Sequence, residues 1–420
     1  MLELTPFPFP CDPFLIQLLR GLRGVVNVKS HQRTLIAVMC FAVIRGAAFA
    51  AENTVTGELP ANVSGILARV AAHDFHPIRD GFTFDRQLNK HGVASLDDQD
   101  WRVRTLAVRD LVRLGAAATP VLVTILEDKN PHVRHVAAMT LGILRATNAV
   151  PALEKVLRED SDSVVRSQAA IALGQIGVRS SLAVVQTAQK EDKSKDVQHQ
   201  AELAAFAIKH GKTATPELAK AYAALDESKF GRVRVGQPAS DFQLTDTEGK
   251  SWRLSDFRGK KPVVLIWVFA DWCPVCHGEF RELIELRRQF ETANAQVFTL
   301  ECHDLFPARV MVGKELEPKY WFSKTSFKDS YTKNIWWPHL VDRAGAVGAE
   351  YGVQPLSFTV HAEWINRPSV VIVDKEGIAQ FTYYGTFWGD RPSIHQLLEM
   401  TRSGNYSFDA PKRLKPESKP

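Results

Sequence analysis

An internal repeat between residues 96 and 225 constrains the fold of this chain more than any other feature. Four segments align on a Val-Arg or Val-Gln pair, and each follows an aspartate-rich turn and precedes a second short apolar helix. They start at Val103, Val133, Val165 and Val197, in steps of 30, 32 and 32 residues. A helical unit of this length buries its apolar face only against its neighbours, so stacked units share one elongated core. The repeat therefore predicts an α-solenoid.

Small residues support close packing within this solenoid. Ala137, Ala138, Ala169 and Ala170 recur at matching places and let two helices approach closely. The pattern resembles HEAT repeats over residues 96–225. The resemblance implies an architecture and leaves two roles open. One is a protein- or peptide-docking surface, and the other is a rigid spacer or a cap on the domain that follows.

The chain changes character after residue 234, where strand-like and helix-like runs alternate, as is typical of an α/β domain. We therefore expect a multidomain protein, in which the α-solenoid is followed by an α/β domain with a thioredoxin-like fold. The expected boundaries are a targeting segment over 1–50, a poorly defined region over 51–95, repeats over 96–225, a linker over 226–234, the α/β domain over 235–402 and a disordered tail over 403–420. The expected elements of the α/β domain are strands over 263–269 and 295–300, an amphipathic helix over 278–290, a hairpin over 369–383 and a closing helix over 392–400.

Two cysteines point to chemistry in the α/β domain. Cys273 and Cys276 follow the predicted buried strand and open the predicted helix. Unpaired N–H groups and the helix dipole favour a thiolate at such a position, so we expect the pKa of Cys273 to lie below that of free cysteine. Cys276 lies within one turn and can close a disulfide onto Cys273, which is the pair that thiol–disulfide exchange needs. Pro274 suits the first helical turn, where its missing N–H costs nothing.

Residues 235–402 resemble the thioredoxin-fold thiol–disulfide oxidoreductases of the bacterial periplasm and their relatives, the peroxiredoxins. Segments 235–244 and 249–259 match the N-terminal strand pair shared by both families, and residues 272–276, which begin with Trp272, match the redox motif. The resemblance implies that Cys273 attacks a substrate disulfide and that Cys276 resolves the mixed disulfide.

The resemblance also assigns a role to Pro368, which stands between Arg367 and Ser369, directly before a predicted strand. This is the place of the family's cis-proline. Carried over to this chain, it implies that the peptide bond before Pro368 is cis, which is uncommon. It also implies that Pro368 packs against the disulfide and that its backbone neighbours pair with an incoming peptide.

Two positions distinguish the related families. A peroxidase of the peroxiredoxin type has Thr three residues before its reactive Cys and Arg six residues before the Asp that ends the later strand. This chain has Cys273 at the first place and Pro368 at the second, with Arg367 one residue away. Both differences favour dithiol exchange over peroxide reduction, which remains the alternative.

The sequence does not identify the group that transfers the proton during thiol exchange. Thioredoxin has a buried acid six residues before its first Cys, where this chain has Trp267. Glu279 and Asp271 are the candidates to replace it.

Metal and haem sites share the spacing of the cysteine pair. Cys273 to His277 also fits the c-type haem attachment pattern, but the sequence shows no cytochrome helix bundle. We instead expect His277 to be a solvent-side neighbour that supports the thiolate, or a surface residue. A zinc site needs further ligands, which only Cys302 and His303 could supply. Cys302 is itself interpreted as a buried small side chain or as an extra resolving or regulatory thiol. We predict no metal and no cofactor.

An aromatic-rich stretch over residues 301–337, which includes Trp336 and Trp337, is longer than a minimal thioredoxin needs. It favours either the lining of a substrate groove or a helical excursion packed on the sheet.

The first fifty residues have the pattern of an export signal. A basic segment precedes the apolar run 34–44, and an Ala-x-Ala site over 48–50 predicts cleavage before Ala51. We therefore expect an exported, periplasmic protein. The alternative is an uncleaved N-terminal anchor, although eleven apolar residues fall short of the roughly 20 that a span needs.

The net charge limits the classes of binding partner that we expect. The net charge is +5, and five basic against two acidic residues over 1–50 leave only +2 on the remainder. This balance gives no basis for nucleic-acid binding. We expect protein thiol or disulfide substrates, a redox partner protein and docking on the helical repeats. A third hypothesis is a binding scaffold whose redox site is vestigial.

Overall fold

The computed structural model describes residues 61–75, 98–269, 273–315, 332–353, 358–360, 363–385 and 391–409. The export signal and Trp272 lie outside these residues. No helix within the described ranges is long and apolar enough to cross a membrane. A first helix, α3 (Ala61–Ala72), precedes the repeats.

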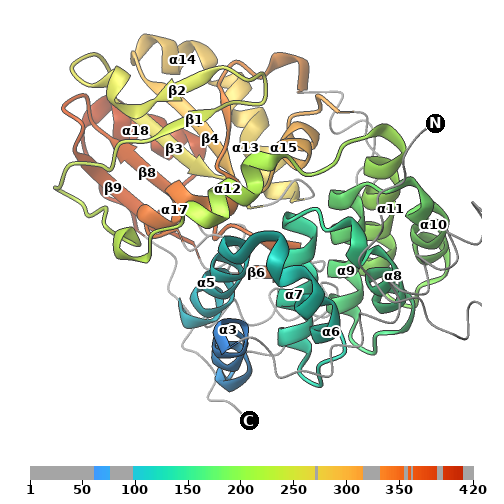
Figure 1. Ribbon diagram of the computed structural model, residues 1–420. Coiled ribbons are helices and arrows are strands. Elements are labelled where there is room, and N and C mark those ends of the chain that lie inside the picture. Colours follow the sequence, from blue (N-terminus) through green and yellow to red (C-terminus); the bar gives the residue numbers. More distant parts are fainter. Residues whose placement is uncertain are drawn as a thin grey trace, which may run out of the picture. The chain divides into compact units, whose positions relative to one another are not determined.

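Paired helices form the repeat region and confirm the predicted α-solenoid. Figure 1 shows α7, α9 and α11 side by side as successive inner helices, with α6, α8 and α10 along their outer side. The helices are α5 (Asp98–Leu114), α6 (Thr119–Ile125), α7 (Pro131–Ile143), α8 (Val150–Glu159), α9 (Ser163–Ile176), α10 (Leu182–Glu191), α11 (Lys195–His210) and α12 (Pro216–Ala224).

The Val-Arg pair of the sequence repeat has a structural role. Arg134 donates two hydrogen bonds of 2.7 Å to the carboxylate of Asp160, which lies in the next Asp-rich turn. Arg166 makes the same bidentate contact with Asp192 at 2.8 and 2.9 Å. Each arginine therefore ties its own repeat to the turn of the following one, which explains why the repeat combines an arginine with an aspartate-rich turn.

A mixed five-stranded sheet forms the centre of the α/β domain, with strand order β5-β4-β3-β8-β9. Strands β3, β4 and β5 run parallel, whereas β8 and β9 are antiparallel to their neighbours. Strands β3, β4, β8 and β9 lie side by side in Figure 1. The bounds are β3 (Val263–Trp267), β4 (Gln296–Glu301), β5 (His339–Val341), β8 (Ser369–Val373) and β9 (Ala379–Tyr384), with two small sheets of β1 (Gln243–Thr245) and β2 (Ser251–Arg253) and of β6 (Phe358–Val360) and β7 (Glu363–Ile365).

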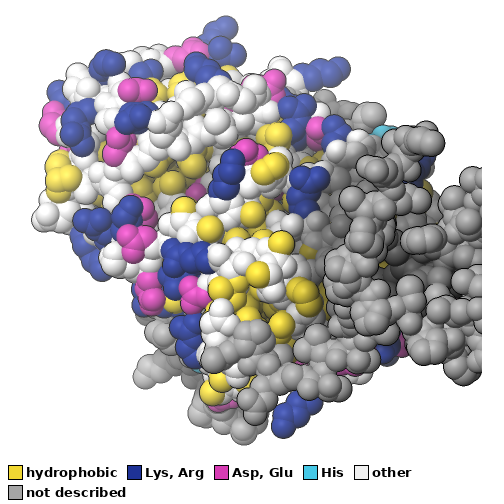
Figure 2. Space-filling model, viewed as in Figure 1, with side chains coloured by type: hydrophobic (Ala, Val, Ile, Leu, Met, Phe, Trp, Pro, Cys, Tyr) yellow, Lys and Arg dark blue, Asp and Glu magenta, His cyan; other side chains and the backbone are white. Residues whose placement is uncertain are grey.

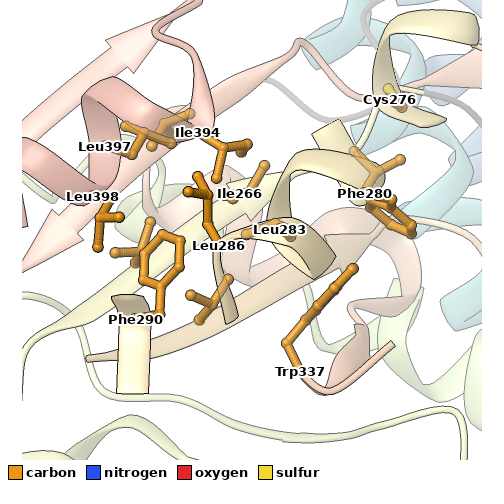
Figure 3. Close-up of a cluster of buried hydrophobic side chains, with 14 of the residues drawn as sticks. Ile266, Cys276, Phe280, Leu283, Leu286, Phe290, Trp337, Ile394, Leu397 and Leu398 are labelled. Atoms are coloured by element: carbon orange, nitrogen blue, oxygen red, sulfur yellow. The ribbon is translucent and has the colours of Figure 1, made fainter. Parts of the chain in front are cut away.

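Two buried clusters lie on opposite faces of this sheet, because side chains alternate along each strand. One face packs against α13, α14 and α18 through the side chains drawn in Figure 3. The other packs against the N-terminal strand pair and α17. The helices of this domain are α13 (Pro274–Glu285), α14 (Arg287–Thr292), α15 (Leu305–Met311), α17 (Ala346–Glu350) and α18 (Ile394–Ser403).

Two expected boundaries differ from the structure. The helix predicted over 278–290 begins at Pro274 and breaks at Leu286, whose backbone leaves helical geometry, and α14 follows. The chain was expected to be disordered from residue 403, but it stays packed on the domain as far as Phe408. The ring of Phe408 meets the ring of Tyr383 edge-on at 5.1 Å. Apolar contacts of two aromatic rings hold this segment although it has no helix or strand.

Asp304 joins the repeats to the α/β domain. Its carboxylate accepts hydrogen bonds from the N–H and hydroxyl of Thr215, at the start of α12, at 2.6 and 2.8 Å. It also accepts from the N–H of Leu305, which caps α15, and from Arg343 at 2.6 Å. The repeats therefore contact the element that directly follows β4.

Charges of both signs are mixed on the face of the molecule that Figure 2 shows. Figure 2 shows Lys and Arg interspersed with Asp and Glu on the face in view, without a stripe of one sign.

Candidate active site

Cys273 and Cys276 lie together at the amino end of α13. Cys273 is the N-cap residue of that helix, and Pro274 takes its first position, as predicted. Both cysteines are free thiols in the structure, and both are wholly buried. The backbone N–H and the thiol of Cys276 both lie within hydrogen-bonding reach of the Cys273 sulfur. The two sulfur atoms are therefore placed for exchange with each other.

The expected fall in the pKa of Cys273 is wrong. Burial raises the pKa of this thiol well above its usual value, and the neighbouring Cys276 thiol adds to the rise. The N–H of Cys276 and the charge of Arg391 act in the opposite direction. The helix N-terminus does favour the thiolate, as the sequence indicated, but removal of the sulfur from water outweighs it.

Arg391 is a site residue that the sequence did not indicate. Its guanidinium donates to the carbonyl oxygen of Trp267, at the end of β3, over 2.8 Å. It makes a buried bidentate contact with the carboxyl group of Glu279 on α13 and donates to the sulfur of Cys276 over 3.6 Å. Arg391 therefore links the central strand, the cysteine helix and one thiol. No sequence signal marks it, because it lies more than 110 residues from its three partners.

Glu279, one of the two expected proton-transfer groups, contacts Arg391 beside the thiols. Burial raises the pKa of its carboxyl to about 8, and the charge of Arg391 offsets part of this rise. A carboxyl that titrates near neutral pH can accept or release a proton in the range where thiol exchange occurs. Asp271, the other candidate, lies outside the described residues.

Pro368 is at the predicted place but not in the implied conformation. Ser369 pairs with Trp267 across β8 and β3, so Pro368 stands next to the chain that leads to the cysteines. The bond that precedes it is trans, and the described residues contain no cis peptide bond. The Pro368 carbonyl accepts from the N–H of Gly385, and the Arg367 guanidinium donates to the Gly385 carbonyl, each over 2.7 Å. With the trans bond before Pro368, the chain makes both of these contacts with Gly385, which directly follows β9.

His277 is buried, with 3% of its surface exposed, so neither expected solvent-side position is correct. It follows Cys273 by four residues, one helical turn, and therefore shares the buried face of α13. Trp336 and Trp337 are also packing residues. The Trp337 ring meets the Phe280 ring edge-on, with 5.1 Å between their centres. Both side chains are labelled in Figure 3. The Trp336 indole donates to the Leu283 carbonyl. These two tryptophans support α13, which favours the packing interpretation for this part of the aromatic stretch.

Cys302 is buried directly after β4, outside the hydrophobic cluster that contains Cys273 and Cys276. The Glu301 carboxylate, the Cys302 thiol and the His303 imidazole lie within 4.8 Å of one another. Neither Cys302 nor His303 joins the cysteine pair, so the described geometry gives no zinc site that combines all three cysteines.

A dithiol at the start of the helix after the central strand defines a thiol redox protein of thioredoxin-like architecture, here joined to an α-solenoid. Residues 235–382 match the model of the AhpC/TSA family, and residues 92–174 match that of HEAT repeats. The chain belongs to the AhpC/TSA family and carries HEAT repeats in its N-terminal part.

The curated relatives include two kinds of thiol enzyme. The chain is 30% identical over 167 residues to thiol-disulfide oxidoreductase ResA of Geobacillus thermodenitrificans, a match that covers 40% of this chain and 78% of the relative. It is 29% identical over 149 residues to alkyl hydroperoxide reductase E of Mycobacterium tuberculosis, covering 36% and 84%. It is 37% identical over 89 residues to thiol:disulfide interchange protein DsbE of Vibrio cholerae, covering 21% and 47%. These relatives support a thiol-based oxidoreductase activity.

Proposed function

We propose that this protein is a thiol–disulfide oxidoreductase that acts on protein substrates through Cys273 and Cys276. The observation that carries the proposal is the buried pair of free thiols within hydrogen-bonding reach of each other at the start of α13. The similarity to ResA and DsbE supports the same reaction class.

In the reductive direction, the Cys273 thiolate attacks a substrate disulfide and releases one substrate thiolate, which takes up a proton. The Cys276 thiolate then attacks the Cys273 sulfur of the mixed disulfide and releases the second substrate thiol. The substrate gains two electrons, and the protein is left with a Cys273–Cys276 disulfide. The oxidative direction is the reverse of these steps, and the reduction potential of the pair decides between them.

Arg391 and Glu279 are the groups placed to prepare the second step. The Arg391 guanidinium contacts the Cys276 sulfur and stabilises negative charge on it. Glu279, held by Arg391, is a buried carboxyl able to exchange a proton near neutral pH. They take the role of the buried acid that thioredoxin has at the position of Trp267, at the end of β3.

Reduction of insulin disulfides by the full chain, with dithiothreitol as electron donor, tests the reaction. Wild type should accelerate reduction. Cys276→Ser should accumulate a mixed disulfide with insulin, because the resolving thiol is missing. The matched Cys273→Ser variant should accumulate none. An inactive wild type, or equal trapping by both variants, overturns the proposal. The reduction potential, measured in glutathione buffers, assigns the direction.

A second candidate function is peroxide reduction, because Arg391 contacts Cys276 and the alkyl hydroperoxide reductase matches over most of its length. The Cys276 thiolate would attack a hydroperoxide, giving an alcohol and a sulfenic acid. Cys273 would then attack that sulfur, giving the disulfide and water. Hydrogen peroxide consumption by wild type, lost in Cys276→Ser and retained for one turnover in Cys273→Ser, would establish this function in place of the first.

For the repeats we propose that they hold the α/β domain and offer their remaining surface to protein partners. Part of the inner face is already covered, since Phe206 of α11 stacks on Phe306 of α15 at 5.8 Å. Cross-linking of the full chain to a trapped substrate, followed by peptide mapping, should place contacts on the outer helices α6, α8 and α10. Contacts confined to the α/β domain would reject docking.

We also propose export to the periplasm. The support is the basic segment, apolar run and Ala-x-Ala site over residues 29–50. N-terminal sequencing of the protein from its own cells should begin at Ala51, whereas a start at Met1 would establish an uncleaved segment.

A further inference from the structure

Three consecutive residues at the end of β4 bring together three kinds of metal ligand. The Glu301 carboxylate, the Cys302 thiol and the His303 imidazole lie within 4.8 Å of one another. Consecutive residues of a strand point to opposite faces, but the strand ends at Glu301 and the chain bends at Cys302 and His303. The bend turns the three side chains toward one region.

The three residues are largely buried and are held by hydrogen bonds. Glu301 is 1% exposed and Cys302 2% exposed, and His303 is partly open. Glu301 is held in place by the N–H of Cys302 at 3.0 Å and by Nδ1 of His303 at 2.7 Å. The position of one ligand is thus fixed by the backbone of the next.

A cavity of about 150 Å³ opens beside these residues, and Cys302 and His303 form part of its wall. Helices α7, α9, α11, α12 and α15 and the loop over 212–214 supply the rest of its lining, which is mostly apolar. The cavity leaves room for a water or small ligand at a further coordination position.

The geometry points to a binding site for a divalent cation of the Zn²⁺ type, formed by Glu301, Cys302 and His303. Thiolate, imidazole and carboxylate together are a zinc ligand set, and three protein ligands with an open position are typical of accessible zinc. Ligand atoms around one zinc ion stand about 3.3 to 3.7 Å apart, so each must move by roughly 1 Å or less. The Glu301–His303 hydrogen bond lengthens to admit the ion.

The charges balance. Binding releases the Cys302 proton to solvent and forms a sulfur–metal bond, without any change of oxidation state. The ion then neutralises one carboxylate and one thiolate, both buried. The site is independent of the proposed exchange reaction, which uses the other two thiols.

Cobalt(II) is the probe that tests this site, because a thiolate ligand gives it a charge-transfer absorption band. The parent is the full chain with Ser at positions 11, 40, 273 and 276, so that Cys302 is the sole thiol. One equivalent of Co²⁺ should develop the band, and Zn²⁺ should remove it by competition. In this parent, Cys302→Ser should abolish the band. Glu301→Gln and His303→Gln should each weaken Zn²⁺ binding about tenfold or more. The surface variant His395→Gln should change nothing.

A second measurement removes dependence on the four substitutions. Wild type with its Cys273–Cys276 pair oxidised should bind Zn²⁺ with the same affinity as the parent, measured by competition with a chromophoric chelator. The proposal is rejected if the folded parent gives no band, or if Glu301→Gln and His303→Gln bind Zn²⁺ as tightly as the parent does. Insulin reduction is assayed separately, so failure here leaves the proposed function standing.

Discussion

Arg391 and Glu279 form a buried bidentate contact beside the Cys276 sulfur, and Arg391 also holds the end of β3. The contact connects two residues that lie 112 positions apart in the sequence. It places one positive charge where the dithiol chemistry generates negative charge.

Removal of this charge should make the thiols less reactive. In Arg391→Gln we expect the pKa of Cys273 to rise further, because the guanidinium acts to lower it. A shift of about one unit reduces the thiolate, and the rate of iodoacetamide alkylation below that pKa, about tenfold. The matched variant Arg287→Gln removes an exposed arginine of α14 and should leave the profile unchanged. A pH–rate profile in Arg391→Gln that coincides with wild type would contradict the assignment.

Glu279 should make stability depend on pH. Its folded pKa of about 8 lies above the usual 4.5, so the folded state keeps a proton that the unfolded state releases between these values. The stabilisation is fully present below about pH 4.5 and is lost as the pH rises through 8. The free energy of unfolding of wild type, relative to Glu279→Gln, should therefore fall by on the order of a few kcal/mol from pH 5 to 8.

Urea unfolding at a series of pH values measures this difference, and groups common to both proteins cancel. Glu291→Gln, at an exposed glutamate of α14, is the control and should give a constant difference. Parallel curves for wild type and Glu279→Gln would show that Glu279 keeps an ordinary pKa.

Local patterns predicted much of the fold. The Val-Arg repeat predicted the solenoid, and the apolar runs predicted β3, β4 and the β8–β9 hairpin, because each depends on periodicity within a short window. The cysteine pair was located for the same reason. Cys273 at a helix N-cap follows from a buried strand that runs into a helix.

Properties that depend on contacts distant in sequence were not predictable. The pKa of Cys273 was predicted to fall because the helix end is local, whereas the burial that raises it comes from packing of the whole domain. Arg391 was missed for the same reason. The bond before Pro368 was inferred from a resemblance, and the contacts with Gly385 that accompany its trans form became visible only in three dimensions.

Asp304 should be essential for the contact between the repeats and the α/β domain. Its carboxylate satisfies Thr215, Leu305 and Arg343, so Asp304→Ala leaves the Arg343 guanidinium without its partner and α15 without its cap. We expect a loss of about 3 kcal/mol in the free energy of unfolding. Urea unfolding checks this, and Asp256→Ala, at an exposed aspartate, should stay within about 0.5 kcal/mol of wild type. A similarly small effect for Asp304→Ala would show that this contact depends on apolar packing alone.

Close approach of the inner repeat helices should make Gly174 intolerant of a methyl group. A Cβ built on Gly174 of α9 would stand 2.9 Å from the Cα of Ala204 on α11, too near for a real contact. Backbone atoms cannot rotate away, so Gly174→Ala should separate the helices and cost about 1–3 kcal/mol. Gly65 on α3 has nothing within 4 Å of its Cβ position, and Gly65→Ala should stabilise by about 0.5–1 kcal/mol through helix propensity. Urea unfolding of the two variants should therefore give shifts of opposite sign. Shifts of the same sign would mean that propensity rather than packing decides at Gly174.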